Sequence, residues 1–229
     1  MNLPSLSERL RCALRYIEKG DTVADIGTDH AYLPIYLVKS GICNSVYACD
    51  INEGPCEKAR ENLGIYSVSP DSVRISRRDG ICGLSGLGIN KFIIFGMGGE
   101  LIAHIIDCEE MPIGTRFILN PMTKQKELRS YLCTHGYEII DDDTVFSDKK
   151  YYQIIYAEKT GKPQSLSDRI TQKFGRYNLE KRTDVFCRYL EKTLRELKYA
   201  QSARAAAGLA SPDDALILEI EAFLSENKK

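Results

Sequence analysis

The first 160 residues alternate between short apolar runs and segments in which apolar residues recur every three or four positions. Short apolar runs bounded by turn residues are typical of buried strands, and the longer period is typical of amphipathic helices. The pattern predicts strands near residues 21–26, 45–50, 72–76, 91–96, 115–120, 137–146 and 150–158. It predicts helices near residues 5–19, 31–40, 54–66, 99–107 and 123–134.

The order of these elements indicates the fold class. Strands that alternate with helices form a parallel sheet with helices on both faces. The last two strands follow each other directly, with a hinge at 147–150, so they predict an antiparallel hairpin at the end of the sheet. The expected fold is an α/β domain with a Rossmann-like sheet of the class I methyltransferase type over residues 1–160.

The composition changes after Glu158, and residues 161–229 are expected to form a helical extension. Their apolar period predicts a hairpin of two helices over roughly 165–227. The first helix is expected to end at Gly208, because glycine readily adopts the left-handed conformation that ends helices. The second is expected to begin at 211–214, where a serine, a proline and two carboxylates suit a helix N-terminus.

The charges balance over the whole chain, with 31 basic and 32 acidic residues and a formal net charge of −1. No overall attraction to nucleic acid results, and any basic surface is local. Residues 169–204 contain ten lysines and arginines against four acids. This segment is either a solvated helix face or a surface that contacts phosphates. In the second case the candidate nucleic-acid contacts are Arg176, Arg182, Arg188 and Arg195.

Eight cysteines are scattered along the chain, mostly within apolar runs, and no two form a C-x-x-C pair. This pattern favours buried, reduced thiols over disulfides or a metal site. The N-terminus lacks a continuous apolar core, and no segment has the roughly 20 apolar residues that span a bilayer. We therefore expect a cytoplasmic protein with no metal and no membrane partner.

The most informative stretch is VADIGTDHAYLP, residues 23–34. A short strand runs into a turn at Gly27 and then into a helix, which is the layout of an adenosine-cofactor site. A dinucleotide site needs two further glycines, where this chain has Asp29 and Tyr32, and a carboxylate would repel a pyrophosphate. S-adenosylmethionine carries a sulfonium, an ammonium and no phosphate. The turn therefore favours S-adenosylmethionine over NAD and predicts a methyltransferase.

Further candidate cofactor contacts follow the other predicted strands. Asp50 ends the second strand, where it can accept the ribose hydroxyls or cap the next helix. Asp79 and Gly80 follow the third strand, where a side chain can reach the adenine amino group, although Asp-Gly is also a common turn. Glycines at 96–99 permit close approach of cofactor and substrate, or form a packing turn. The candidate set is Asp25, Gly27, Asp50, Ile51, Asp79, Gly80, Gly96, Met97 and Gly98.

Three residues are candidates for the methyl-transfer step: Asp29, His30 and Asn120. Asp29 stands where a glycine is usual, and a carboxylate buried there is costly unless it is paired or used. His30 flanks the same turn and has either a structural role or a contact with a target base. Asn120 opens an Asn-Pro-Met sequence similar to the N-P-P-Y element of adenine amino-methyltransferases, although turn chemistry also explains it.

Together these motifs resemble one family. DIGTDHAYLP at 25–34, GMGGELI at 96–102, Asn-Pro-Met after the fifth strand and the helical extension are similar to the bacterial tRNA adenine-N(1) methyltransferases of the TrmK kind. The resemblance implies methyl transfer from S-adenosylmethionine to ring nitrogen 1 of adenosine 22 in the tRNA D-arm. It also implies a Rossmann-like domain with a coiled-coil-like extension. The chain departs from the family at 120–122, where better-known members have a Gln-Pro-Asn type of sequence.

The chemistry implied by the resemblance agrees with an acidic site. Ring nitrogen 1 is already a nucleophile, so the enzyme mainly has to align it with the methyl group. Methylation leaves a positive charge on the adenine, which a nearby carboxylate stabilises. Asp29 is the candidate for this role, through its charge or by accepting a hydrogen bond from the exocyclic amine. Because the adenine lies in a folded tRNA arm, local unstacking or flipping is implied.

Two other classes of function stay open. A small-molecule or protein methyltransferase would have the same cofactor turn, but a small substrate gives no reason for ten basic residues on one helical segment. A non-catalytic RNA-binding module or nucleotide-binding regulator would lack the methyl transfer, and calorimetry with S-adenosylmethionine and NAD separates that class.

Overall fold

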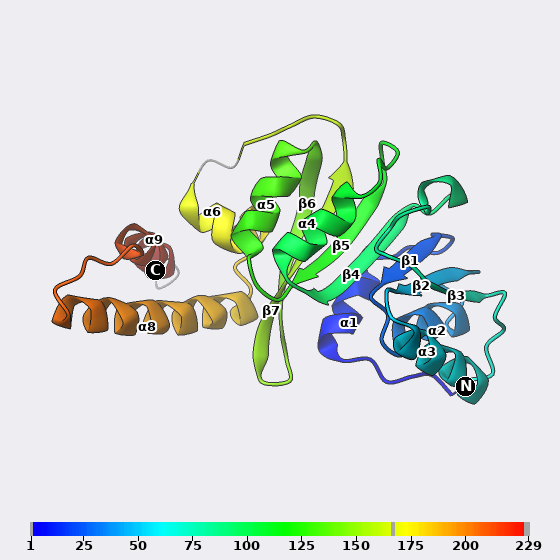
Figure 1. Cartoon of the computed structure of the whole chain (residues 1–229). Helices are drawn as coiled ribbons and strands as arrows, with labels where there is room; N and C mark the ends of the chain where they lie inside the picture. The colour runs from blue at the N-terminus through cyan, green and yellow to red at the C-terminus, as the bar shows by residue number, and fades with distance from the viewer. Residues whose placement is uncertain (1, 166–167, 227–229) are drawn as a thin grey trace.

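The computed structural model describes residues 2–165 and 168–226, and its centre is one seven-stranded sheet (Figure 1). The strands are β1 (Val23–Ile26), β2 (Val46–Asp50), β3 (Val73–Arg77), β4 (Lys91–Met97), β5 (Arg116–Pro121), β6 (Tyr137–Ser147) and β7 (Lys150–Lys159). Their order is β3-β2-β1-β4-β5-β7-β6, with β7 antiparallel to both neighbours and the other pairs parallel. The predicted Rossmann-like fold with a terminal hairpin is confirmed.

The β6–β7 hairpin turns through Asp148 and Lys149, as the sequence predicts. Both residues have positive φ, 49° and 63°. Two consecutive residues in this region form a turn of the I′ kind, whose twist matches that of adjacent antiparallel strands.

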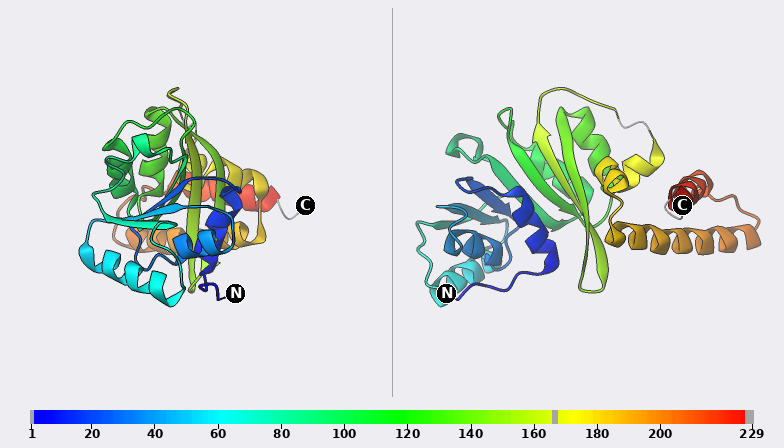
Figure 2. Two further views of the ribbon diagram at one scale, coloured as in Figure 1. Left: turned by 90° about the vertical axis from the view of Figure 1, so that its right-hand side faces the viewer. Right: turned by 180° about the vertical axis from the view of Figure 1, so that it is seen from behind.

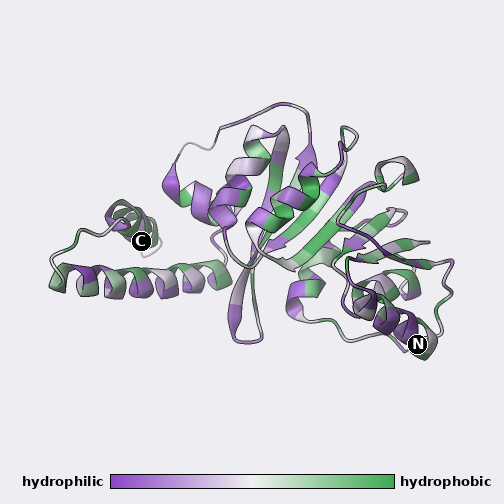
Figure 3. Ribbon diagram, in the orientation of Figure 1, coloured by the Kyte–Doolittle hydropathy of each residue, from purple (hydrophilic) through white to green (hydrophobic). Residues whose placement is uncertain are grey.

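Helices cover both faces of the sheet (Figure 2). α2 (Tyr32–Lys39) and α3 (Glu53–Ile65) pack on one face, and α4 (Gly99–Asp107) and α5 (Gln125–Thr134) pack on the other. Side chains alternate along the central strands, so Ile93 packs in the core with α2 while its neighbours pack in the core with α4. Figure 3 shows the apolar central strands between these layers. Burial on both faces explains the continuous apolar runs in the sequence.

The N-terminal helix is shorter than the predicted range of 5–19. α1 (Glu8–Ala13) has Ser7 as its cap, and a 3₁₀ turn, η1 (Leu14–Tyr16), follows it. Ile17 is already extended, with φ −113° and ψ 123°. It nevertheless packs in the same core as the helix, which is why the apolar pattern continues beyond the helix end.

The C-terminal region is helical, as predicted, but two short helices precede the expected pair. These are α6 (Arg169–Phe174) and α7 (Arg176–Lys181), followed by α8 (Asp184–Ala206) and α9 (Asp214–Glu226). Gly175, at φ +88°, separates α6 from α7. The sequence pattern did not reveal this break, because the residue's conformation depends on its contact with the sheet.

α8 ends before Gly208, whose φ of +72° confirms the predicted helix stop. Figures 1 and 2 show that α8 projects away from the sheet and that α9 crosses α8 at a steep angle. These helices share a small core with α6, made of Phe174, Phe186, Leu190, Leu216 and Ile220. Residues 166–167 and 227–229 of the predicted extension lie outside the described residues.

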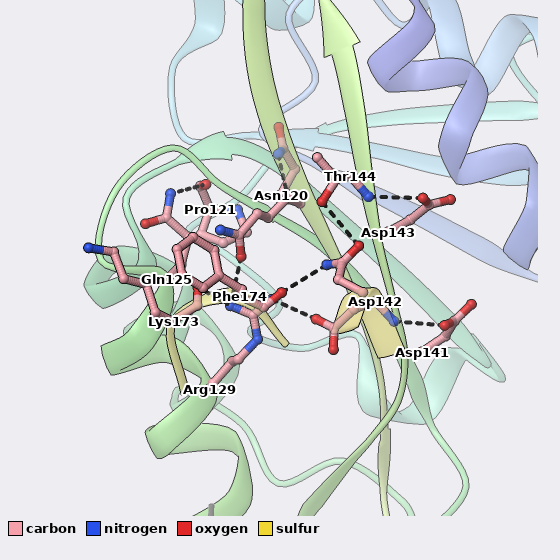
Figure 4. Close-up of polar contacts among 12 residues, drawn as sticks. Asn120, Pro121, Gln125, Arg129, Asp141, Asp142, Asp143, Thr144, Lys173 and Phe174 are labelled. Carbon is pink, nitrogen blue, oxygen red and sulfur yellow. Dashed lines mark hydrogen bonds and ion pairs between the residues drawn. The ribbon is translucent and has the colours of Figure 1, made fainter. Parts of the chain in front are cut away.

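A buried polar network joins the extension to the sheet (Figure 4). Arg129 of α5 donates from Nη2 to Oδ1 of Asp142 on β6 at 2.6 Å. Its Nη1 donates to Oε1 of Gln153 at 2.8 Å and to the backbone carbonyl of Lys173 at 3.1 Å. Gly175 lies against the same carboxylate, since a Cβ there would be 2.3 Å from Asp142. The network therefore fixes α6 and α7 to the sheet.

The eight cysteines all lie within the described residues and none forms a disulfide; five of them are buried, as expected. Cys82 and Cys108 are exposed, in contrast to the prediction, because they lie in the segments after β3 and α4 rather than inside strands. Within residues 2–165 and 168–226, none of the helices has the length and apolar character that a bilayer span requires.

Candidate active site

The turn after β1 lies at the carboxyl edge of the sheet, where the strand order reverses between β1 and β4. Ligands of doubly wound sheets bind at this switch point. Gly27 makes the turn at φ +79°, and the N–H groups of Gly27 and Thr28 donate to the Cys49 carbonyl at 2.8 and 2.9 Å. A Cβ at position 27 would lie 2.2 Å from Met97 Cε. The backbone conformation therefore favours glycine here, and any side chain would also displace the end of Met97.

A cavity of about 190 Å³ opens beside this turn. It has carboxylates at two strand ends and apolar side chains from α4. Its lining consists of Ile26, Gly27, Asp50, Ile51, Arg78, Asp79, Gly80, Met97, Leu101, His104, Ile105 and Cys108. The structure thus brings six of the nine predicted cofactor contacts around one cavity. Sequence reasoning missed the α4 side chains, because a helix facing a ligand and one facing a core have the same apolar period.

The other three predicted cofactor contacts lie elsewhere. Gly96, at φ +81°, is next to Arg9, whose Nη1 would be 3.6 Å from a Cβ at that position. A Cβ on Gly98 would lie 3.2 Å from Thr123 Oγ1, so this glycine permits packing of the turn from β4 into α4. Asp25 lines a second cavity instead.

Asp25 is buried on β1. Burial raises the pKa of its carboxyl to about 6, and repulsion from Asp50 acts in the same direction. A cation beside this carboxyl would stabilise its charged form.

The second cavity, of about 180 Å³, adjoins the Gly27 turn as well. The rings of His30 and Tyr32 stack within it, with centroids 5.2 Å apart. Its lining consists of Arg9, Leu10, Asp25, Gly27, Thr28, Asp29, His30, Ala31, Tyr32, Leu33 and Phe95. Because Gly27 lines both cavities, ligands in the two would meet at this residue.

Asp29 is exposed, so the expectation that burial constrains its carboxylate is wrong. Its side chain is 78% exposed, and its Oδ2 lies 3.2 Å from His30 Nε2. The turn directs the side chain outward at the edge of the sheet, so the charge keeps its hydration and carries no large desolvation cost.

Asn120 is completely buried at the end of β5 (Figure 4). Its Nδ2 donates to the backbone carbonyl of Gln153 at 2.9 Å, and its Oδ1 accepts from Arg9 Nη1 at 3.3 Å. Both ends of the amide are therefore engaged inside the protein. Sequence reasoning missed Arg9, because it lies 111 positions from its partner in an ordinary amphipathic pattern.

Two of the predicted nucleic-acid contacts are ion-paired. Arg176 pairs with Glu180 at 2.6 Å, and Arg182 pairs with Glu226 at 2.7 Å. The Arg182 guanidinium also lies over the Phe223 ring, 4.1 Å from its centroid. Both pairs reduce the charge that these arginines present to a phosphate.

The other two predicted contacts lie on α8. Arg188 Nε donates to the backbone carbonyl of Asp184 at 3.3 Å. Arg195 lines a hollow between α8 and α9 together with Glu191 and Glu221. α9 thus supplies carboxylates to a surface that looks strongly basic when only residues 169–204 are counted.

A second basic groove lies where the starts of α5 and α9 meet α6. Its lining consists of Lys124, Gln125, Lys126, Glu127, Arg169, Lys173, Pro212, Asp213 and Leu216. Lys124 lies 3.5 Å from Glu127 and 3.6 Å from Glu100. Lys126, Arg169 and Lys173 have no carboxylate within ion-pair distance in the part of the chain that the structure describes. We call this surface the α5–α6 groove.

Comparison with known proteins identifies the family. The model of a methyltransferase domain matches residues 6–155. The tRNA (adenine(22)-N(1))-methyltransferase of Bacillus subtilis (strain 168) is 32% identical over 208 residues, covering 88% of this chain and 85% of that protein.

Two solved structures match over the extension as well. Sp1610 of Streptococcus pneumoniae, in complex with S-adenosyl-L-methionine, is 26% identical, with a TM-score of 0.82 over 96% of this chain and 100% of that one. M. capricolum TrmK, in complex with S-adenosyl-homocysteine, is 26% identical, with a TM-score of 0.74 over 96% and 95% of the two chains. By the extent of these matches and the identity to the B. subtilis enzyme, the chain belongs to the tRNA (adenine(22)-N(1))-methyltransferase family.

Proposed function

We propose that this protein transfers a methyl group from S-adenosylmethionine to ring nitrogen 1 of adenosine 22 in tRNA. The observation that carries the proposal is the meeting of two cavities at Gly27. One combines carboxylates with apolar walls, and the other combines aromatic rings with an exposed carboxylate. The B. subtilis relative is named for this reaction, which supports the same assignment here.

The first cavity and the carboxyl next to it suit S-adenosylmethionine, which supplies an electrophilic methyl group when it is bound. Asp50 uses Oδ1 to accept the Asn52 N–H at 2.8 Å, and its other oxygen is available for a ribose hydroxyl. Ile51 is 52% exposed beside it and offers an apolar surface to the adenine. We assign Asp79 to the adenine amino group and Asp25 to the ammonium. The raised pKa of Asp25 is consistent with a carboxyl that is completed by a cationic ligand.

The second cavity suits the target base. His30, Tyr32 and Phe95 offer ring surface to an adenine that has left its stack. Nitrogen 1 is nucleophilic without deprotonation, so alignment is the main task of these residues.

Asp29 would stabilise the positive charge that develops on the adenine. In the free protein this carboxylate faces water, where a charge pair at 4 Å is worth about 1 kcal/mol. Bound tRNA would exclude that water, and the same pair is worth about 4 kcal/mol near a protein surface. His30, 3.2 Å away, would hold the carboxylate in place.

We assign methyl transfer to residues 1–160 and binding of the tRNA body mainly to residues 161–229. Arg176, Arg182, Arg188 and Arg195 stay candidates for phosphate contacts. Lys126, Arg169 and Lys173 of the α5–α6 groove are stronger candidates than Arg176 and Arg182, because they form no ion pair within the described residues, although Glu127 and Asp213 also line the groove. The groove starts three residues after β5 ends, so it leads from the sheet edge to the extension. A tRNA substrate implies action in the cytoplasm.

The direct test is nucleoside analysis of tRNA after incubation with the protein and S-adenosylmethionine. We expect N(1)-methyladenosine in tRNA that has adenosine at position 22 and none when guanosine replaces it. Methyl transfer to a small molecule or a protein, with unmodified tRNA, would support the alternative methyltransferase classes instead.

A further inference from the structure

Arg9 of α1 reaches across the carboxyl edge of the sheet. Its Nη1 donates to Asn120 Oδ1 at 3.3 Å and approaches Met122 Sδ at 3.7 Å. Its guanidinium carbon lies 5.2 Å from the centroid of the Tyr152 ring on β7. Nη1 also lies beside Gly96 of β4, 3.6 Å from the position that a Cβ would take there. Contacts from several strands therefore hold a helix residue at the edge where the substrate cavity opens.

Asn120 fixes the direction of this contact. Its amide is buried, and because Nδ2 is engaged by the Gln153 carbonyl, Oδ1 faces Arg9. A buried amide with both ends bonded has one favoured orientation. Arg9 Nε and Nη2 have no acceptor among the described residues, so the guanidinium keeps donors for a ligand. Arg9 lines the cavity that also contains Asp29 and His30.

Electrostatics exclude nitrogen 1 of the adenine as the partner of Arg9. Methylation makes the adenine cationic, and the cofactor sulfonium is cationic before it. A guanidinium directed at the reacting atoms would oppose the developing charge. The partner of Arg9 is therefore an anion, and RNA supplies one as a phosphodiester. The other anion at the site is the carboxylate of the cofactor, and calorimetry of Arg9 variants separates the two, because a guanidinium bound to that carboxylate would lower cofactor affinity when it is removed. The planar guanidinium fork also matches the geometry of phosphate oxygens.

A flipped nucleotide brings its own phosphates to the mouth of the cavity that receives its base. We propose that Arg9 binds a backbone phosphate of the target nucleotide and that Asn120 is a positioning residue for Arg9. This inference rests on the proposed function. It gives the α1 helix, which precedes the sheet in sequence, a part in holding the extruded nucleotide.

The test removes the charge from each side of the contact. Single-turnover methylation is measured with tRNA in which a neutral methylphosphonate replaces the phosphate on either side of adenosine 22. For the unaltered protein we expect one of the two replacements to slow methylation by about tenfold or more. R9Q should slow methylation of ordinary tRNA by a similar factor and show no further decrease with that methylphosphonate, since the two changes remove one interaction.

Arg11 provides a matched control on the same helix. Its Nε donates to the Leu6 carbonyl at 3.0 Å and lies 3.8 Å from Glu8, and the residue does not line the cavity. R11Q should keep the normal rate and the normal sensitivity to methylphosphonate. R9K, which keeps the charge without the fork, should lie between R9Q and the unaltered protein. Cofactor affinity, measured by calorimetry, should stay within about twofold in all of these variants.

The positioning role of Asn120 has its own readout. N120A should slow methylation in the normal background and should add nothing to the defect of R9Q. A merely structural role would lower the thermal unfolding temperature in both backgrounds and leave the ratio of rates for phosphate and methylphosphonate tRNA unchanged.

Two outcomes overturn the inference while leaving the proposed function in place. One is an R9Q protein that methylates ordinary tRNA at the normal rate. The other is that each methylphosphonate slows methylation by R9Q by the same factor by which it slows methylation by the unaltered protein. If the unaltered protein does not methylate ordinary tRNA, the proposed function fails and the Arg9 assignment fails with it.

Discussion

Arg129 and Asp142 form a buried ion pair at the joint between the catalytic sheet and the helical extension, with exposed side-chain fractions of 0% and 1%. The pair links α5 to β6, and Arg129 also binds the last turn of α6 through the Lys173 carbonyl. A charge that loses its partner in such a place stays buried and unpaired. This joint therefore offers a clear test of how the two parts of the chain are held together.

We expect Arg129→Met to lower the free energy of unfolding by about 3–5 kcal/mol, because it leaves Asp142 buried without a partner. Adding Asp142→Asn should restore part of the stability, since a neutral amide replaces the charge. Arg60→Met breaks the exposed pair with Glu53 and should cost no more than about 1 kcal/mol. Urea denaturation measures all three. Equal effects of Arg129→Met and Arg60→Met would contradict a structural role for the joint.

We expect replacement of Asp25 to have opposite effects on protein stability and on cofactor binding. The pKa of its carboxyl is about 6 in the folded protein, against an ordinary value of 3.8. Between about pH 4 and 6 the folded protein therefore holds a proton that the unfolded chain has already released. Stability of the cofactor-free protein therefore falls as pH rises through this range, by about 3 kcal/mol. Asp25→Asn should remove this pH dependence and raise stability at pH 7.5.

The same Asp25→Asn change should weaken binding of S-adenosylmethionine by about tenfold or more, because the ammonium loses a charged partner. In the unaltered protein, affinity should fall as pH drops below about 6 and Asp25 becomes protonated. Calorimetric titration at pH 5 and pH 7.5 checks both statements. An Asn variant that is less stable and binds normally would remove Asp25 from the cofactor site.

Gly27 should tolerate no side chain. In Gly27→Ala the new Cβ meets Met97 Cε at 2.2 Å, and the residue must adopt φ +79°. We expect cofactor affinity to fall at least tenfold and stability to fall by about 1–2 kcal/mol. Gly54→Ala is the control, since no atom lies within 4 Å of its Cβ position in α3 and alanine favours helices. Normal cofactor binding by Gly27→Ala would mean that the turn is not part of the site.

Asp29→Asn separates catalysis from binding. The exposed carboxylate does not line the cofactor cavity, so cofactor affinity should stay within a few fold. Turnover on tRNA should fall by roughly 100-fold if the charge stabilises the methylated adenine. Steady-state kinetics together with calorimetry decides between roles. A loss of cofactor binding would assign Asp29 to the binding site, and normal turnover would make it structural.

The two basic surfaces can be compared directly by the salt dependence of tRNA binding. Replacement of Lys126, Arg169 and Lys173 by alanine should reduce the slope of log affinity against log salt by about one for each phosphate that the variant no longer binds. Replacement of Arg182, Arg188 and Arg195 should have the smaller effect, because carboxylates of α8 and α9 lie beside Arg182 and Arg195. The reverse order would place the tRNA on α8 instead of the α5–α6 groove.

The sequence alone determined the order of the strands and of the helices between them, the hairpin and the cofactor turn. Each of these features rests on residues that are neighbours in the chain, so their period, turn chemistry and charge can be read locally. Residues at strand ends could also be grouped correctly around Gly27, because the carboxyl ends of parallel strands meet at one edge of the sheet.

Only the tertiary structure decided which side chains complete the site and which charges are available. The contact of Arg9 with Asn120, the break at Gly175 against Asp142 and the pairing of Arg182 with Glu226 each join segments that are far apart in the chain. The exposure of Asp29 depends in the same way on what surrounds the turn. Burial and ion pairing depend on contacts between segments that are distant in the chain, so they cannot be predicted from the hydrophobic period of one segment.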